Sequence, residues 1–130
     1  MALQITALYA ALIGLWAVAL SLYVSINRGK YKALHGDGGN PEMAAIIRRH
    51  ANLTETAPLA LILMGLAEVS GLGPTWMHVL GVILIAARLV HPFGISVSNP
   101  GSPLRIVGAV GTHIVTAGCS VFILWTALSS

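Results

Sequence analysis

Two long stretches of this chain carry no charged side chain. Residues 1–27 and 106–130 contain no Asp, Glu, Lys or Arg. Of the 130 residues, 56% are hydrophobic and 8% are charged, whereas soluble domains are about 45–50% apolar and about 25% charged. A chain this short cannot bury so much apolar surface in a water-soluble core, because small domains bury only about two-thirds of their surface. The sequence therefore predicts an integral membrane protein.

Four apolar segments are each long enough to cross a bilayer, and we expect them to form one membrane domain, an all-α four-helix bundle. A helix rises about 1.5 Å per residue, so a hydrocarbon core of about 30 Å needs about 17–25 residues, and the third segment is only just long enough. The first segment is too long for the apolar part of a cleavable signal peptide, so it should remain in the mature protein. The expected spans are residues 2–26, 41–69, 74–91 and 103–128.

Two of these spans begin with a recognisable helix start. Asn40 precedes Pro41, and Ser102 precedes Pro103. Proline suits the first position of a helix, and an Asn or Ser before it can accept hydrogen bonds from the first free N–H groups. We therefore expect Asn40 and Ser102 to cap the second and fourth spans.

The basic residues are unevenly distributed along the chain. They flank the first and third connections, whereas the second connection and both termini have none. Cytoplasmic loops are enriched in Lys and Arg, so we expect these two connections in the cytoplasm and both termini on the opposite side. The net charge of +3 then reflects topology, and we expect no nucleic-acid partner. The residues are Arg28, Lys30, Lys32, Arg48, Arg49, Arg88 and Arg105.

The second span begins with an unusual polar run. Arg48, Asn52 and Glu55 are spaced four and three residues apart, which places them on one helix face. An unpaired carboxylate inside an apolar run is costly, and Arg48 can reach Glu55 directly or through Asn52. Two interpretations stay open: a buried ion pair that locks helix packing, or a polar wall for a charged ligand.

The later spans add basic groups near the same membrane face. Arg88 and His91 share a face at the end of the third span, although a lone arginine there can simply extend to the interface. Arg105 lies in the first turn of the fourth span, where a cation opposes the helix dipole. It marks either an anion site or a charge that only sets topology. The excess of arginines suits a small multivalent anion, and the apolar spans suit a lipophilic second substrate.

The remaining reactive side chains are isolated. Cys119 is the only cysteine, so one chain can form neither an internal disulfide nor a thiolate metal site, and we expect no metal. We expect Cys119 to be a small buried hydrophobic residue. His78 and His113 are expected to be hydrogen-bonded residues of the core or an interface.

One run of residues resembles a family signature. Arg48-x-His50-x-Asn52-x-x-Glu55-x-x-Pro58 is similar to the motif of the MAPEG family, the membrane-associated proteins of eicosanoid and glutathione metabolism. The resemblance covers nearly the whole chain: four spans, a basic first loop, and two later motifs in the expected order. These motifs are Arg88-x-x-His91 and Pro103-x-Arg105.

The resemblance implies a homotrimer, with glutathione bound between neighbouring subunits near the cytoplasmic face. Arg105 resembles an arginine held near the glutathione thiol, where it would stabilise the thiolate nucleophile and act as the catalytic residue. Arg28 and Arg48 would hold carboxylates of glutathione. Asn52 or Glu55 would meet its amino group or amides. The implied glutathione-binding residues are Arg28, Arg48, Asn52, Glu55, Arg88 and His91.

The chain departs from some family members at three positions. Ala51 stands where some have a further arginine, Ile95 where some have a tyrosine, and Ile106 where one branch has a serine. We therefore do not expect the specialised eicosanoid chemistry.

The leading hypothesis is a glutathione-dependent transferase or peroxidase that acts on lipophilic electrophiles, in the cell inner membrane if the source is bacterial. Because some relatives bind lipids without catalysis, the alternative is a non-catalytic protein of the same scaffold that binds lipid or a small anion. A transporter or channel fits the sequence less well, because the polar groups cluster at one membrane face and do not form a path across the bilayer. A haem protein built on His50, His91 or His113 would give a coloured preparation.

Overall fold

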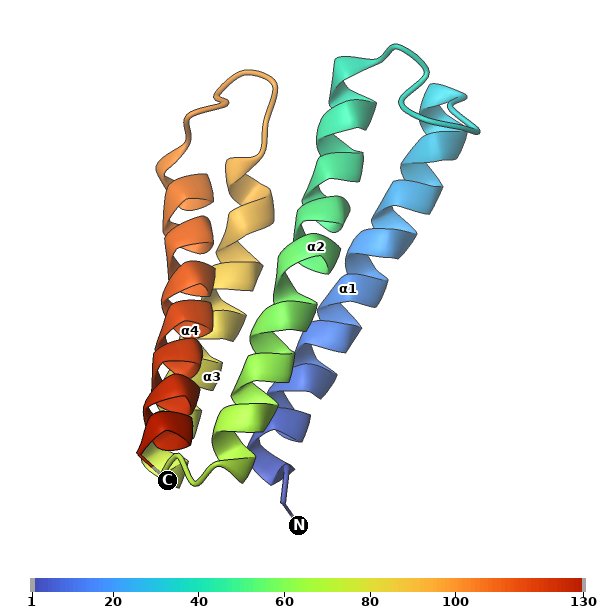
Figure 1. Cartoon of the computed structure of the whole chain (residues 1–130). Helices are drawn as coiled ribbons and strands as arrows, with labels where there is room; N and C mark the ends of the chain where they lie inside the picture. Colours follow the sequence, from blue (N-terminus) through green and yellow to red (C-terminus); the bar gives the residue numbers. More distant parts are fainter. Residues whose placement is uncertain (1, 130) are drawn as a thin grey trace.

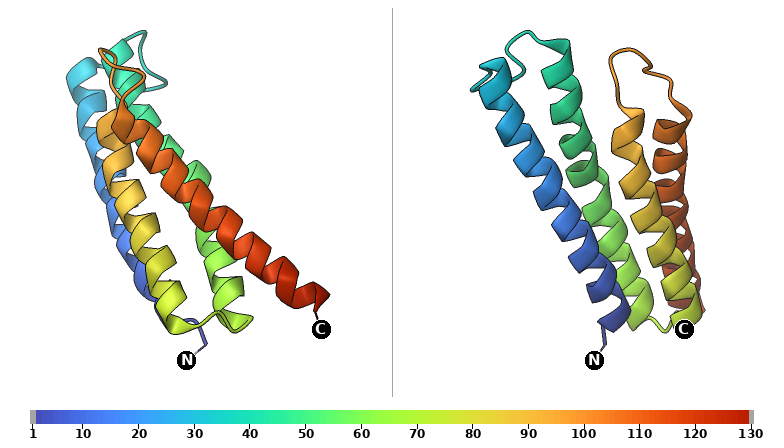
Figure 2. Two further views of the ribbon diagram at one scale, coloured as in Figure 1. Left: turned by 90° about the vertical axis from the view of Figure 1, so that its left-hand side faces the viewer. Right: turned by 180° about the vertical axis from the view of Figure 1, so that it is seen from behind.

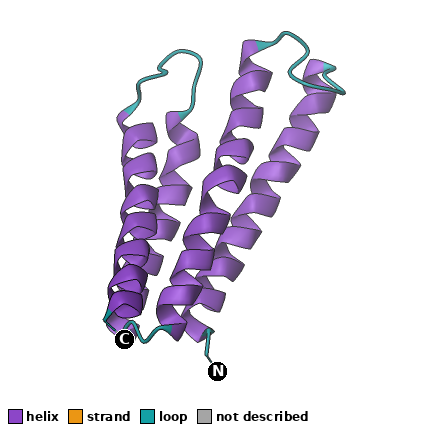
Figure 3. Ribbon diagram, in the orientation of Figure 1, coloured by secondary structure: helices purple, strands orange, loops and turns teal. Residues whose placement is uncertain are grey.

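The computed structural model describes residues 2–129 and shows four antiparallel helices side by side (Figure 1). No strand occurs within those residues (Figure 3), so the predicted all-α four-helix fold is confirmed. A short 3-10 helix, η1, follows the third helix. The elements are α1 (Gln4–Tyr31), α2 (Pro41–Val69), α3 (Pro74–Val90), η1 (His91–Gly94) and α4 (Pro103–Leu128).

Both ends of the described chain lie at one end of the bundle, and the α1–α2 and α3–α4 connections lie at the other (Figure 1). We call the latter the basic end, because Arg28, Lys30 and Lys32 lie there. α4 diverges from its neighbours towards its C-terminal end (Figure 2).

The first helix is longer than its apolar run. It continues through the polar residues after Ile26 and ends at Tyr31. Lys32 then adopts a left-handed conformation with φ 52°, and its N–H contacts the carbonyls of Arg28 and Gly29. Helical hydrogen bonding does not require apolar side chains, so the helix stops at this backbone reversal and not at the predicted boundary.

The two predicted helix caps have different outcomes. The Asn40 side chain accepts hydrogen bonds from the N–H groups of Glu42 and Met43, at 2.9 and 3.3 Å, so this cap is confirmed. Ser102 makes no side-chain cap, and that prediction is wrong. Its backbone carbonyl accepts the N–H of Arg105 instead, so α4 begins through main-chain bonding alone.

The composition of three helices suits a membrane crossing. α1, α3 together with η1, and α4 are long and apolar enough to span a bilayer among the described residues. α2 carries more charge, but its 29 residues pack lengthwise between α1 and α4 (Figure 2). Large apolar side chains such as Leu15 and Ile62 point outward. The chain is an integral membrane protein.

Glycines allow α3 and α4 to approach each other closely at the basic end. A Cβ on Gly108 would overlap with His91 and with the Ala87 carbonyl, and one on Gly111 would overlap with the Ala87 side chain. This contact brings the α4 backbone against the end of α3, where Arg88 is located.

The opposite end of the bundle is tied by polar contacts. The Glu68 carboxylate of α2 accepts the N–H groups of Ile5 and Thr6, at 2.9 and 2.8 Å, and thereby caps α1. The Tyr9 hydroxyl lies 3.1 Å from Nδ1 of His78, as expected for a hydrogen-bonded histidine. His113, for which the same role was expected, lies exposed on α4 without such a bond among residues 2–129. Cys119 is a buried core residue, as predicted.

Candidate functional site

A buried arginine forms the centre of the polar cluster inside the bundle. Arg88, near the end of α3, is only 2% exposed. Its Nη1 donates to Asn52 Oδ1 at 2.8 Å and to Thr56 Oγ1 at 3.0 Å, and its Nη2 donates to the Gly108 carbonyl at 2.6 Å. The guanidinium therefore joins α2, α3 and α4. The interpretation that Arg88 merely extends to the interface is wrong, because α4 covers it.

Thr56 is oriented for this contact by its own helix. Its hydroxyl donates to the Asn52 carbonyl at 2.8 Å, which leaves the oxygen lone pairs free to accept from Arg88. Thr56 lies one helical turn after Asn52, so the two side chains lie on the same face of α2.

No acceptor around Arg88 carries a negative charge. The acceptors are an amide, a hydroxyl and a backbone carbonyl, and Nε has no hydrogen-bond partner among the described residues. A buried charge is costly unless it is paired as well as hydrogen-bonded. The cluster is thus positively charged, and one of its buried donors has no hydrogen-bond partner within residues 2–129.

His91 lies beside this cluster. It begins η1, is 3% exposed, and packs against Gly108 at the point where α4 comes closest. Trp16 of α1 donates its Nε1–H to the Arg88 carbonyl at 3.0 Å, which holds the end of α3 from the other side. Asn52, Arg88 and His91 are therefore brought together within one chain.

Arg48 and Glu55 form an ion pair away from that cluster. Nη1 and Nη2 of Arg48 contact Oε1 and Oε2 of Glu55 at 3.0 and 2.7 Å. Of the two routes left open, direct or through Asn52, the structure shows the direct one, and Asn52 faces Arg88 instead. Their side chains are 48% and 53% exposed, so the interpretation as a buried pair is wrong for the single chain. The pair lies on the outer surface of α2.

Arg28 and Arg105 each contact a neighbouring connection. Arg28 Nη1 donates to the carbonyls of Ala33 and Gly36, at 3.0 and 2.7 Å, and so braces the α1–α2 connection. Arg105 Nη1 donates to the Pro100 carbonyl at 3.0 Å and braces the α3–α4 connection. Among residues 2–129, neither of them hydrogen-bonds to Arg88 or to the groups that Arg88 contacts.

Several residues at the site were not among the predicted site residues. Thr56 could have been found from its helical spacing to Asn52, whereas Gly108 and Trp16 reach the site only through tertiary packing. Arg49 donates Nε and Nη2 to the Ile95 carbonyl at 3.1 and 2.9 Å, which ties α2 to the segment after η1. Among residues 2–129, no three His, Cys, Asp or Glu side chains lie close enough together to hold a metal ion.

Comparison with known proteins gives two results. The MAPEG family profile matches residues 6–125. Two proteins named inner membrane protein YecN, from Escherichia coli strain K12 and from Escherichia coli O6:H1 strain CFT073, are each similar to the chain. Each is 41% identical over 92 residues, which is 70% of this chain and 70% of the relative.

Proposed function

The chain belongs to the MAPEG family, and on that premise we propose that it is a glutathione-dependent transferase or peroxidase acting on lipophilic electrophiles in the membrane. Glutathione would enter as the cosubstrate from the aqueous side, and the electrophile would arrive through the bilayer. Membership of the family suggests a membrane protein of glutathione or eicosanoid metabolism. The residues at the site support the choice of glutathione-dependent chemistry.

The observation that carries the proposal is the uncompensated charge of Arg88. This guanidinium is buried and has only neutral acceptors, so an anion bound next to the cluster would offset its charge without touching it. Glutathione is a suitable counter-ion, because it has two carboxylates and a thiol that can ionise.

In a homotrimer, neighbouring subunits would bring together charged groups that lie far apart in one chain. Arg48 and Glu55 lie on the outer surface of α2, and Arg28 and Arg105 lie at the basic end. All four are available to a neighbouring subunit, unlike Arg88. We propose that glutathione lies between subunits, with Arg28 and Arg48 holding its carboxylates and Asn52 or Glu55 its amino group or amides.

Arg105 is the proposed catalytic residue. A guanidinium next to the glutathione sulfur favours the thiolate over the thiol, and the thiolate is the attacking nucleophile. In a transferase reaction the sulfur forms a bond to the electrophilic carbon while the leaving group departs with the bonding electrons. The thiol proton is released to solvent.

The proposed location is the bacterial inner membrane, because both relatives are named as inner membrane proteins. We propose that the basic end faces the cytoplasm and that both chain ends lie on the opposite side. Glutathione dissolved in the cytosol would then reach the arginines directly.

The deciding experiment uses the purified full-length protein in detergent. Ultraviolet difference absorption after glutathione is added should show a thiolate signal, and chlorodinitrobenzene should be conjugated. If neither signal appears while the protein binds no glutathione in calorimetry, the proposal fails.

A second candidate is a non-catalytic protein on the same scaffold that binds lipid or a small anion. Ile95, which is 7% exposed, stands where some members have a tyrosine that contacts the ligand. Lipid that co-purifies with a protein showing no turnover would favour this candidate.

A further inference from the structure

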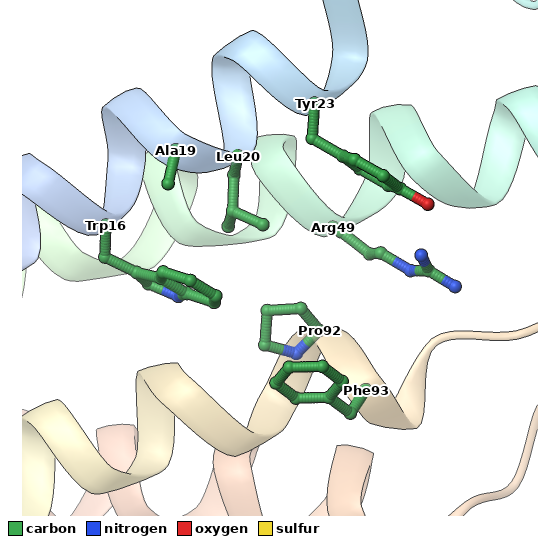
Figure 4. A pocket seen from close by; sticks show the side chains of 7 residues that line it. All are labelled: Trp16, Ala19, Leu20, Tyr23, Arg49, Pro92 and Phe93. Carbon is green, nitrogen blue, oxygen red and sulfur yellow. The ribbon is translucent and has the colours of Figure 1, made fainter. Parts of the chain in front are cut away.

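A cavity of about 360 Å³ lies between α1 and η1. Trp16 and Leu20 of α1 form one wall, and Phe93 of η1 faces them from the other side (Figure 4). Tyr23 and Arg49 also line it. Apart from these two side chains, the lining is apolar, as is usual for a lipophilic ligand site.

The two polar groups lie at the same end of the cavity. Figure 4 shows the Tyr23 hydroxyl and the Arg49 guanidinium next to each other, with Trp16 at the opposite end. Trp16 and Tyr23 are seven residues apart on α1, a rise of about 10 Å. The cavity therefore has a polar end nearer the basic end of the bundle and an apolar end nearer its middle.

The positive charge of Arg49 is available to bind a ligand. Its Nε and Nη2 bind the Ile95 carbonyl, which fixes the guanidinium, whereas Nη1 has no hydrogen bond to residues 2–129. The ion pair found among those residues joins Arg48 to Glu55, so no carboxylate neutralises Arg49.

The cavity is accessible from the side of the bundle. Phe93 is 70% exposed and Tyr23 is 44% exposed, so a molecule in the bilayer can enter between α1 and η1. The volume is near the lower end of the range of about 300–1,000 Å³ for ligand sites. It suits part of one acyl chain and not a whole two-chain lipid.

We propose that this cavity holds one acyl chain of a phospholipid with a net negative headgroup, and that Arg49 binds the headgroup. The lipid comes from the leaflet at the basic end, where basic pockets between transmembrane helices bind anionic headgroups. The acyl chain runs from Tyr23 towards Trp16. None of the residues that line the cavity is a proposed glutathione contact, so lipid binding here can be tested without glutathione.

Trp16 provides a direct probe. The chain has three tryptophans, and the other two, Trp76 and Trp125, are each 64% exposed and can be replaced by phenylalanine. The W76F/W125F protein is reconstituted in phosphatidylcholine vesicles that contain brominated phosphatidylglycerol or, at the same mole fraction, brominated phosphatidylcholine. Bromine quenches tryptophan fluorescence only at short range.

We expect the phosphatidylglycerol to quench Trp16 with about fivefold higher relative affinity, the effect of one basic residue near a lipid surface. Arg49→Gln should remove this preference, whereas Lys30→Gln, which removes an exposed charge at the same end, should keep it. Ala19→Phe places a ring in the cavity wall and should lower quenching by phosphatidylglycerol to the level of phosphatidylcholine, even if Arg49→Gln disturbs folding.

Equal quenching by the two lipids, no quenching by either, or a preference that survives Arg49→Gln would overturn the proposal. Stronger quenching by brominated oleate than by brominated phosphatidylglycerol would assign the cavity to a free fatty acid. That result would also overturn the proposal of a phospholipid.

Discussion

The Arg88 guanidinium donates a 2.8 Å hydrogen bond to the Asn52 side chain, and this bond ties the end of α3 to the first half of α2. The same contact holds the buried positive charge that we propose attracts glutathione to the site. Asn52 can therefore be altered in two ways that separate the stability of the bundle from its function.

Asn52→Ala should lower the free energy of unfolding. It leaves Nη1 of Arg88 with Thr56 as its remaining acceptor, and a buried donor that loses a partner costs about 1–3 kcal/mol. Denaturation in mixed micelles with increasing sodium dodecyl sulfate measures the change.

Thr54→Ala is the matched control for that experiment. Thr54 is exposed on α2, and its hydroxyl bonds only to the carbonyls of His50 and Ala51 in its own helix. Its removal should change stability much less. Equal losses in the two variants would mean that the Arg88 contact does not stabilise the bundle.

Asn52→Asp should weaken glutathione binding without unfolding the protein. The new carboxylate can accept the same hydrogen bond from Arg88 and would neutralise its charge within the chain. Because two charges about 8 Å apart interact by about 2 kcal/mol at an effective dielectric constant of about 20, affinity should fall about tenfold to a hundredfold. Isothermal calorimetry measures it, with Thr54→Asp adding the same charge away from Arg88. An unchanged affinity in Asn52→Asp would show that Arg88 does not recruit the anion.

The fold could be predicted from the sequence because the apolar runs and the turn residues between them point to the same spans. The end of α1 could not be placed in this way. Its last turn contains two basic residues, Arg28 and Lys30, and is ended by the left-handed conformation of Lys32, a backbone property that hydropathy does not report. The Ser102 side chain likewise has the right chemistry for a cap, but it is the Ser102 backbone carbonyl that accepts the N–H groups of Arg105 and Ile106.

The candidate site could be predicted where its contacts lie within one helix. Arg48 and Glu55 are seven residues apart on α2, and their pairing follows from that spacing. The Arg88 contacts cross between helices over 36 and 20 residues of sequence. They depend on the close approach that Gly108 allows, which no spacing within one helix indicates.

Gly108→Ala should destabilise the protein. The added Cβ would overlap with His91 and the Ala87 carbonyl, and forcing extra volume into a packed contact typically costs about 1–3 kcal/mol. Separation of α4 from α3 would also lengthen the bond between Arg88 and the Gly108 carbonyl. The unfolding midpoint in detergent checks this prediction.

Gly118→Ala, on the same helix, is the control. The nearest atom to its Cβ would be Leu80 Cδ2 at 3.9 Å, an ordinary contact. Alanine favours the helix over glycine by about 0.5–1 kcal/mol, so this variant should be as stable as the parent or slightly more stable. A midpoint for Gly108→Ala equal to that of Gly118→Ala would mean that α3 and α4 are not tightly packed there.

Replacement of two arginines should separate the binding of glutathione from its activation. Arg105→Ala should abolish the thiolate absorption while glutathione still binds, because the proposed role of Arg105 is to stabilise the ionised sulfur. Arg48→Ala should weaken binding, since it removes a proposed partner of a glutathione carboxylate. Calorimetry gives the affinity and ultraviolet difference absorption gives the thiolate, with Lys30→Ala as a control that removes an exposed charge at the same end. The assignment of Arg105 is wrong if its alanine variant forms the thiolate as fully as the parent does at saturating glutathione.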